Sequence, residues 1–100
     1  MLVVSGMLEF KPEDRDFVLA GLVDITERSR NDPGCVEYWW AEEVDVPNRF
    51  RFFEVWETRE LFEAHRDMPH EHDFMDRYVS RITGADAHIH DVTDRKSAIG

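Results

Sequence analysis

Apolar residues recur along this chain at two different periods, and the order of those periods constrains the fold more than any other feature. Apolar residues at every second position predict four strands, over residues 2–10, 35–46, 50–56 and 87–92. Helical spacing predicts two helices, from Pro12 to the turn at Asn31 and from Thr58 to Gly84, the second interrupted at Pro69. The order is that of the ferredoxin-like βαββαβ class, so we expect an α+β domain with an antiparallel four-stranded sheet.

The strands carry apolar residues on both faces of the predicted sheet. Two helices can cover only one face of a four-stranded sheet. Trp39 and Trp40 are neighbours in one strand, so their side chains point to opposite faces. A second copy of the chain is the simplest cover for the other face. We therefore expect a homodimer, each chain consisting of one domain over residues 1–94 and a polar tail over 95–100.

The formal net charge of −10, from 22 acidic and 12 basic residues, limits the partners. Such a charge repels phosphate backbones and anionic lipid surfaces, so we expect neither nucleic acid nor a membrane as a partner. The N-terminal segment lacks the basic and apolar regions of a secretion signal, and no apolar run is long enough to cross a bilayer. Cys35 is the only cysteine, which excludes an intramolecular disulfide. We expect a cytoplasmic protein.

Short segments through most of the chain resemble the antibiotic biosynthesis monooxygenase family. They are Asn31–Tyr38 (NDPGCVEY), Pro47–Phe50 (PNRF), Glu54–Glu57 (EVWE) and Leu61–His65 (LFEAH) with His70. The resemblance implies a dimeric α+β barrel in which each subunit keeps a pocket between its sheet and its helices. Many members of this family oxygenate aromatic polyketides or quinols with O2 and without metal, flavin or haem. Others degrade haem or act on small signalling molecules.

The resemblance implies that Trp56 and His65 meet near one end of this pocket, and we take both as candidate catalytic residues. Oxygenation without a cofactor needs a substrate that is deprotonated to an enolate or phenolate, which can then pass an electron to O2. His65 can accept that proton near neutral pH, inside a dry apolar cavity. Trp56 offers a stacking wall and one N–H donor. The alternatives are a half-buried His65 bonded to a neighbouring strand and a Trp56 that belongs to the core.

Glu54 lies in a row of aromatic residues, between Phe52 and Trp56 on one strand face. A buried carboxylate needs a partner or a raised pKa. Glu54 therefore either orients a histidine or a substrate hydroxyl, or forms a salt bridge with Arg49, Arg51 or the dimer mate; we favour the salt bridge. Phe52 and Glu54 are candidate substrate-binding residues.

Three further residues are candidates for substrate binding. His70 matches the second histidine of the family pattern and either lines the pocket mouth or begins the second half of the helix after Pro69. Tyr38 and Tyr78 can each bond a substrate oxygen, although both also suit a core position with a wet hydroxyl.

The remaining histidines do not predict a metal site. His70 and His72 point about 200° apart on a helix, so they cannot share an ion unless the segment is unwound. His88 and His90 share a strand face but lack a third ligand at close spacing. Haem is not expected either, because haem-degrading relatives carry an Asn on the first strand where this chain reads Val4–Met7 (VSGM). We expect no metal and no cofactor.

The leading hypothesis is a cofactor-independent monooxygenase that oxidises a small aromatic phenol or quinol with O2. The competing hypothesis is non-oxidative: a dimeric module that binds a small molecule or acts as an isomerase. A fold supports many functions, so the resemblance alone does not choose between them.

Overall fold

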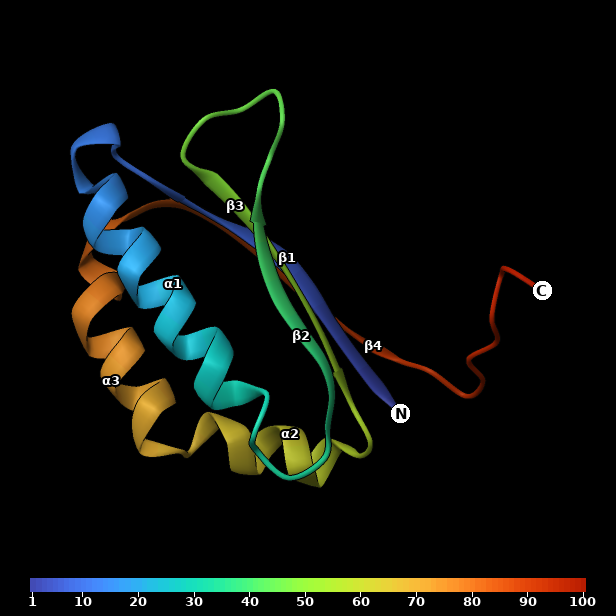
Figure 1. Cartoon of the computed structure of the whole chain (residues 1–100). Coiled ribbons are helices and arrows are strands. Elements are labelled where there is room, and N and C mark those ends of the chain that lie inside the picture. Colours follow the sequence, from blue (N-terminus) through green and yellow to red (C-terminus); the bar gives the residue numbers. More distant parts are fainter.

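The structure, a computed structural model, describes residues 1–100 and has the predicted order of strands and helices (Figure 1). The strands are β1 (Leu2–Phe10), β2 (Cys35–Glu42), β3 (Arg49–Trp56) and β4 (Ile82–Asp91). The helices are α1 (Arg15–Ser29), α2 (Arg59–Arg66) and α3 (Pro69–Tyr78), with short 3-10 turns η1 (Pro12–Asp14) and η2 (Val79–Arg81). Neighbouring strands pair antiparallel in the order β2-β3-β1-β4, which confirms the ferredoxin-like α+β fold.

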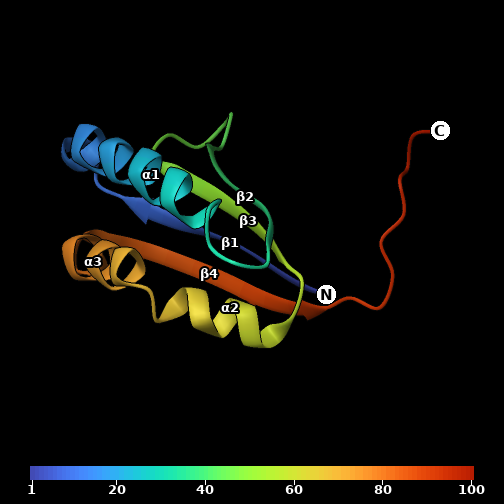
Figure 2. The same cartoon turned by 60° about the horizontal axis from the view of Figure 1, so that its bottom comes forward.

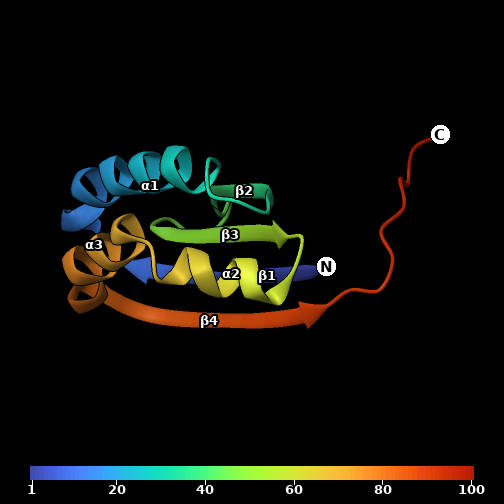
Figure 3. The ribbon, with the colours of Figure 1, turned by 90° about the horizontal axis from the view of Figure 1, so that it is seen from below.

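All three helices lie on one face of the sheet (Figure 1). Figures 2 and 3 show α1 and α3 side by side, with α2 lying along the sheet beyond α3. The core fills the space between these helices and the inner face of the sheet. Its buried residues are Leu2, Val4, Phe10, Val18, Leu22, Ile25, Tyr38, Phe50, Trp56, Phe62, Phe74 and Tyr78. No helix is long and apolar enough to cross a membrane.

The outer face of the sheet has no helix on it and carries an apolar patch. We call this the outer patch: Val3 and Met7 of β1, Trp39 of β2 and Phe53 of β3. Trp39 pairs with Phe53 across the strands and stacks on it, with ring centroids 5.6 Å apart. Trp39 is 36% exposed in the single chain. The predicted two-sided apolar sheet is thus present, and the dimer that would cover it stays a prediction.

The start of β4 differs from the prediction. The second helical region ends at Tyr78, and η2 leads directly into β4 at Ile82, five residues before the expected start at Ala87. Val79, which lies within the predicted second helical region, is 51% exposed. Pairing with β1 is the cause: the ladder continues to a Phe10–Ile82 pair across a register shift, so strand pairing outweighs the local helical pattern.

Strand β2 ends four residues earlier than predicted, so the loop of the β2–β3 hairpin is longer. The Glu43 N–H donates to the Arg49 carbonyl oxygen at 2.8 Å, so β2 ends at Glu42 rather than at Val46. The apolar residue Val44 lies fully exposed in the loop. Asn48 has a φ of +65°, a left-handed conformation that asparagine tolerates in turns.

Gly34 shapes the turn between α1 and β2, and its replacement is expected to be costly. Its φ is +81°, and a Cβ at this position would lie 2.4 Å from Leu61 Cδ1. We expect Gly34→Ala to lower the free energy of unfolding by about 1–3 kcal/mol, measured by urea denaturation. Gly84→Ala is the matched control, because its Cβ would meet only the flexible Glu9 carboxylate. Equal stability of the two variants would contradict this account.

Candidate functional site

A hollow of about 280 Å³ lies between the inner face of the sheet and the helices α2 and α3. Its apolar lining consists of Val4, Leu8, Tyr38, Trp40, Phe52, Phe62, Phe74, Met75 and Ala87. Its polar lining consists of Glu54, His65, Arg66 and Glu71. A concave apolar wall with a few polar groups is typical of a small-molecule site. The hollow suits a small, mostly apolar ligand.

His65 is placed in this hollow by α2. Thr58 begins the helix by accepting a hydrogen bond from the Leu61 N–H at 3.1 Å, and Phe62 and His65 then fall on the same buried face. The His65 ring stacks on Trp56 with centroids 4.5 Å apart and planes 28° apart. Only 2% of the His65 surface is exposed. The ring is therefore held between the core and the hollow.

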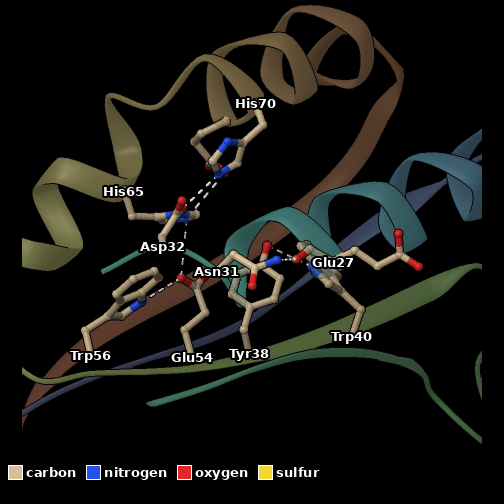
Figure 4. A network of polar contacts seen from close by, with 10 residues as sticks. Glu27, Asn31, Asp32, Tyr38, Trp40, Glu54, Trp56, His65 and His70 are labelled. Atoms are coloured by element: carbon tan, nitrogen blue, oxygen red, sulfur yellow. Dashed lines mark hydrogen bonds and ion pairs between the residues drawn. The ribbon is translucent and has the colours of Figure 1, made fainter. Parts of the chain in front are cut away.

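The two nitrogens of His65 face different groups (Figure 4). Nδ1 lies 2.7 Å from Asp32 Oδ2. Nε2 lies 3.5 Å from Glu71 Oε2 and 3.8 Å from Glu54 Oε1, on the side of the hollow. Three carboxylates thus surround one buried imidazole.

Glu54 keeps its carboxylate inside, with Trp56 as its hydrogen-bond partner. Its Oε1 accepts from Trp56 Nε1 at 3.0 Å. Burial raises the pKa of Glu54 to about 7, although the Trp56 hydrogen bond partly opposes this rise. The favoured salt bridge with Arg49 or Arg51 is absent, because both guanidinium groups bind Glu43. Burial also raises the pKa of Glu71.

Asp32 completes the polar cluster and was not predicted from the sequence. Its Oδ2 lies 2.7 Å from His65 Nδ1 and 2.8 Å from His70 Nε2, so one oxygen bridges two histidines (Figure 4). Pro69 begins α3 and sets His70 in the first turn, where its ring reaches Asp32. The turn sequence NDPG marked only the end of α1, and nothing local shows that the Asp32 side chain points toward α2. The three ligand atoms lie within 4.8 Å of one another, so this group could hold a metal ion.

The candidate residues divide into two groups. Tyr38, Phe52, Glu54 and His65 line the hollow, and Trp56 supports the His65 ring from below without any exposed surface of its own. The Tyr38 hydroxyl accepts from Trp40 Nε1 at 3.1 Å, and burial raises its pKa.

His70 and Tyr78 lie outside the hollow. His70 is on the far side of Asp32 and faces a groove between α1 and α3. The Tyr78 hydroxyl donates to the Phe17 carbonyl oxygen at 3.1 Å, in the packing between the same two helices. His88 and His90, with ring centroids 6.5 Å apart, are exposed on β4.

The model of one protein family, antibiotic biosynthesis monooxygenase, matches residues 1–77. The chain belongs to this family. An uncharacterized Synechocystis protein, sll1783, is 34% identical over 76 residues, which cover 76% of this chain and 52% of that protein. This chain therefore spans about half the length of that relative. The Bacillus subtilis protein named "Putative monooxygenase YcnE" is 27% identical over 70% of this chain and 74% of its own.

Solved structures of the antibiotic biosynthesis monooxygenase family show the same fold. A Deinococcus radiodurans member superposes with a TM-score of 0.91 over 100% of both chains, at 21% identity. A Chloroflexus aurantiacus member gives a TM-score of 0.81 over 99% of this chain and 98% of its own, at 25% identity. Likeness at this level of identity describes the architecture rather than the substrate.

Proposed function

We propose that this chain is a cofactor-independent monooxygenase that oxidises a phenol- or quinol-type aromatic small molecule with O2. Membership of the family supports a monooxygenase-like role on a small molecule. The observation that carries the finer proposal is the apolar hollow that ends at Nε2 of the buried His65. An aromatic ring would pack against the contiguous wall of Trp40, Phe52 and Phe74, with its hydroxyl directed toward that nitrogen.

Asp32 favours the tautomer of His65 that a base on the side of the hollow requires. When Nδ1 donates its proton to Asp32 Oδ2, at 2.7 Å, the lone pair of the neutral ring lies on Nε2, which faces the hollow. His65 then takes the substrate hydroxyl proton, and Asp32 stabilises the resulting imidazolium. Trp56 holds the ring plane by stacking at 4.5 Å and acts as a positioning residue.

The substrate anion supplies the electrons for the oxygenation. It passes one electron to O2, and the two radicals combine at a ring carbon to form a peroxide anion. The peroxide takes the proton back from His65. At a carbon that carries a hydrogen, the C–H and O–O bonds then break, water leaves with that hydrogen and the outer oxygen, and a carbonyl remains. The apolar lining keeps other water out during this sequence.

A non-oxidative function is the second candidate, and the pair Glu54 and His65 favours it. The two groups face the same hollow, with Oε1 and Nε2 3.8 Å apart, and burial sets the pKa of Glu54 at about 7. Two titratable groups at one end of a pocket can move a proton between two sites of a ligand without O2. The absence of oxygen consumption would favour this candidate.

Removal of the His65 base is expected to abolish the proposed oxygenation. We expect purified protein with a chelator present and no added cofactor to consume O2 with a panel of anthrones and quinols. His65→Gln should slow that uptake at least about 100-fold, because positioned bases contribute on the order of 10²–10⁴ in rate. The measurement is O2 consumption with an electrode.

His72→Gln is the matched control, because His72 is exposed on α3 and lies outside the hollow. Its rate should equal that of the wild type. No uptake with any substrate, or equal rates in wild type and His65→Gln, would overturn the proposal. We also propose that the protein is a homodimer and lies in the cytoplasm. The outer patch supports the homodimer.

A further inference from the structure

Asp32, His65 and His70 present a ligand set that zinc-class metal ions prefer. Imidazole nitrogen and carboxylate oxygen are common ligands of such ions. The three side chains come from separate segments, namely the α1–β2 turn, α2 and α3, and they converge by folding rather than by sequence proximity. Their side chains are 7%, 2% and 14% exposed, respectively, so this is no chance encounter of mobile surface groups.

The ligand atoms lie close enough to share a small ion after a local adjustment, since all three are within 4.8 Å of one another. A tetrahedral zinc site with bonds of about 2.0–2.1 Å places its ligand atoms about 3.3 Å apart. Asp32 Oδ2 lies 2.7 Å from His65 Nδ1 and 2.8 Å from His70 Nε2, distances that a shared proton sets. Replacing the two protons by one ion would move these atoms apart by about half an ångström.

A second, independent feature is the environment of the other His65 nitrogen. Metal-bound histidines usually donate their second N–H to a carboxylate, which fixes the ring and its tautomer. His65 Nε2 faces Glu71 Oε2 at 3.5 Å and Glu54 Oε1 at 3.8 Å. A proton on Nε2 would leave the Nδ1 lone pair directed toward Asp32. The cluster also holds the carboxyl groups of Asp32, Glu54 and Glu71, whose ionised forms a dication would stabilise.

The cluster borders a surface groove through one of its three ligands. His70 lines the groove between α1 and α3, together with Asp24, Asp73 and Arg77. Water in this groove would supply the fourth ligand through the side that His70 leaves open, where 14% of its side chain is exposed. The His65 ring directs Nδ1 toward Asp32 and Nε2 toward Glu54 and Glu71, two carboxylates that line the hollow.

We propose that Asp32 Oδ2, His65 Nδ1 and His70 Nε2 form a binding site for a divalent transition-metal ion of the zinc class. An ion at Nδ1 holds the ring proton on Nε2, so the same ring cannot accept a proton from the hollow. The ion is thus an inhibitor of the proposed oxygenation rather than its cofactor. This last consequence rests on the proposed function, whereas the binding site does not.

Titration of chelator-stripped protein with Zn²⁺ alone tests the site without any substrate. We expect calorimetry to give one ion per chain, and Co²⁺ as a probe to show the visible absorption of a four-coordinate site. His70→Gln should weaken binding at least about tenfold. The control His72→Gln should bind Zn²⁺ as the wild type does. If circular dichroism shows that His70→Gln folds poorly, Asp32→Asn serves as the second ligand variant.

The exposed pair His88 and His90 is the competing site on this chain. The double variant His88→Gln/His90→Gln should therefore keep the wild-type affinity. Loss of binding in that variant, unchanged affinity in His70→Gln, or no binding by the wild type would each overturn the proposal. If no substrate caused oxygen uptake, the proposed oxygenation would be refuted, but the Zn²⁺ titration would still test the binding site. If uptake occurs, Zn²⁺ should suppress it in the wild type and less so in His70→Gln.

Discussion

Glu54→Gln is expected to stabilise the protein by about 3 kcal/mol above pH 7 and to change its stability much less near pH 5. Burial raises the folded-state pKa of Glu54 from 4.5 to about 7. Between these values the folded state binds more protons than the unfolded state, so the wild type loses stability as pH rises. A shift of this size corresponds to about 3 kcal/mol, at about 1.4 kcal/mol per pH unit. Glutamine avoids the loss because it never ionises.

The substitution keeps the local hydrogen bond. The amide oxygen of glutamine can accept from Trp56 Nε1 as Glu54 Oε1 does, at 3.0 Å. Urea unfolding at several pH values between 5 and 8, with a chelator present, gives the difference in the free energy of unfolding. Glu63→Gln is the control, because Glu63 is exposed on α2 and its solvation changes little on folding. A Glu54→Gln effect that is the same at pH 5 and pH 8 would show that Glu54 is not desolvated.

The periodicity of apolar residues was sufficient to predict the fold, because local spacing and tertiary packing agree over most of the chain. The alternation in β1 and β3 places Leu2, Val4, Phe50 and Trp56 on the inner face, and all four are buried. The interruption at Pro69 separates α2 from α3 as expected. The start of β4 could not be predicted, since it is set by pairing with β1.

The site could be predicted only in part, for a geometric reason. Strand alternation puts Tyr38, Phe52 and Glu54 on the helix-covered face, and helical spacing puts His65 opposite them. Asp32 stands 33 residues before His65, in a turn whose side-chain directions depend on how α1 packs. No local pattern carries that information.

Tyr78 shows the same limit on a helix. Of the two positions considered for it, a substrate contact and the core, Tyr78 occupies the core face of α3, where it is 4% exposed. That face has two neighbours, the sheet and α1, and Tyr78 packs toward α1. A Cβ on Gly21 would lie 2.2 Å from the Tyr78 hydroxyl, so the absence of a side chain at Gly21 admits the ring. Sequence spacing gives the buried face of a helix but not which neighbour each residue meets.

Phe53→Asp is expected to convert a homodimer into monomers. Phe53 stacks on Trp39 in the outer patch, and no helix of the same chain lies on that face. An Asp introduced there would be buried without a partner in a dimer and solvated in a monomer, a difference of several kcal/mol. The monomer fold should persist, because Phe53 is not part of the core cluster. Sedimentation should show the mass falling from twice 11.8 kDa to 11.8 kDa.

Val44→Asp is the matched control, since it makes the same kind of change at a fully exposed loop position. It should leave the mass at the dimer value and the circular dichroism spectrum unchanged. A wild type that is monomeric at every concentration would mean that water covers the outer patch. A Phe53→Asp variant that stays dimeric would mean that the copies meet elsewhere. In both cases no second sheet would pack on the outer patch. The sheet that forms one wall of the hollow beside His65 would then be stabilised by its own chain alone.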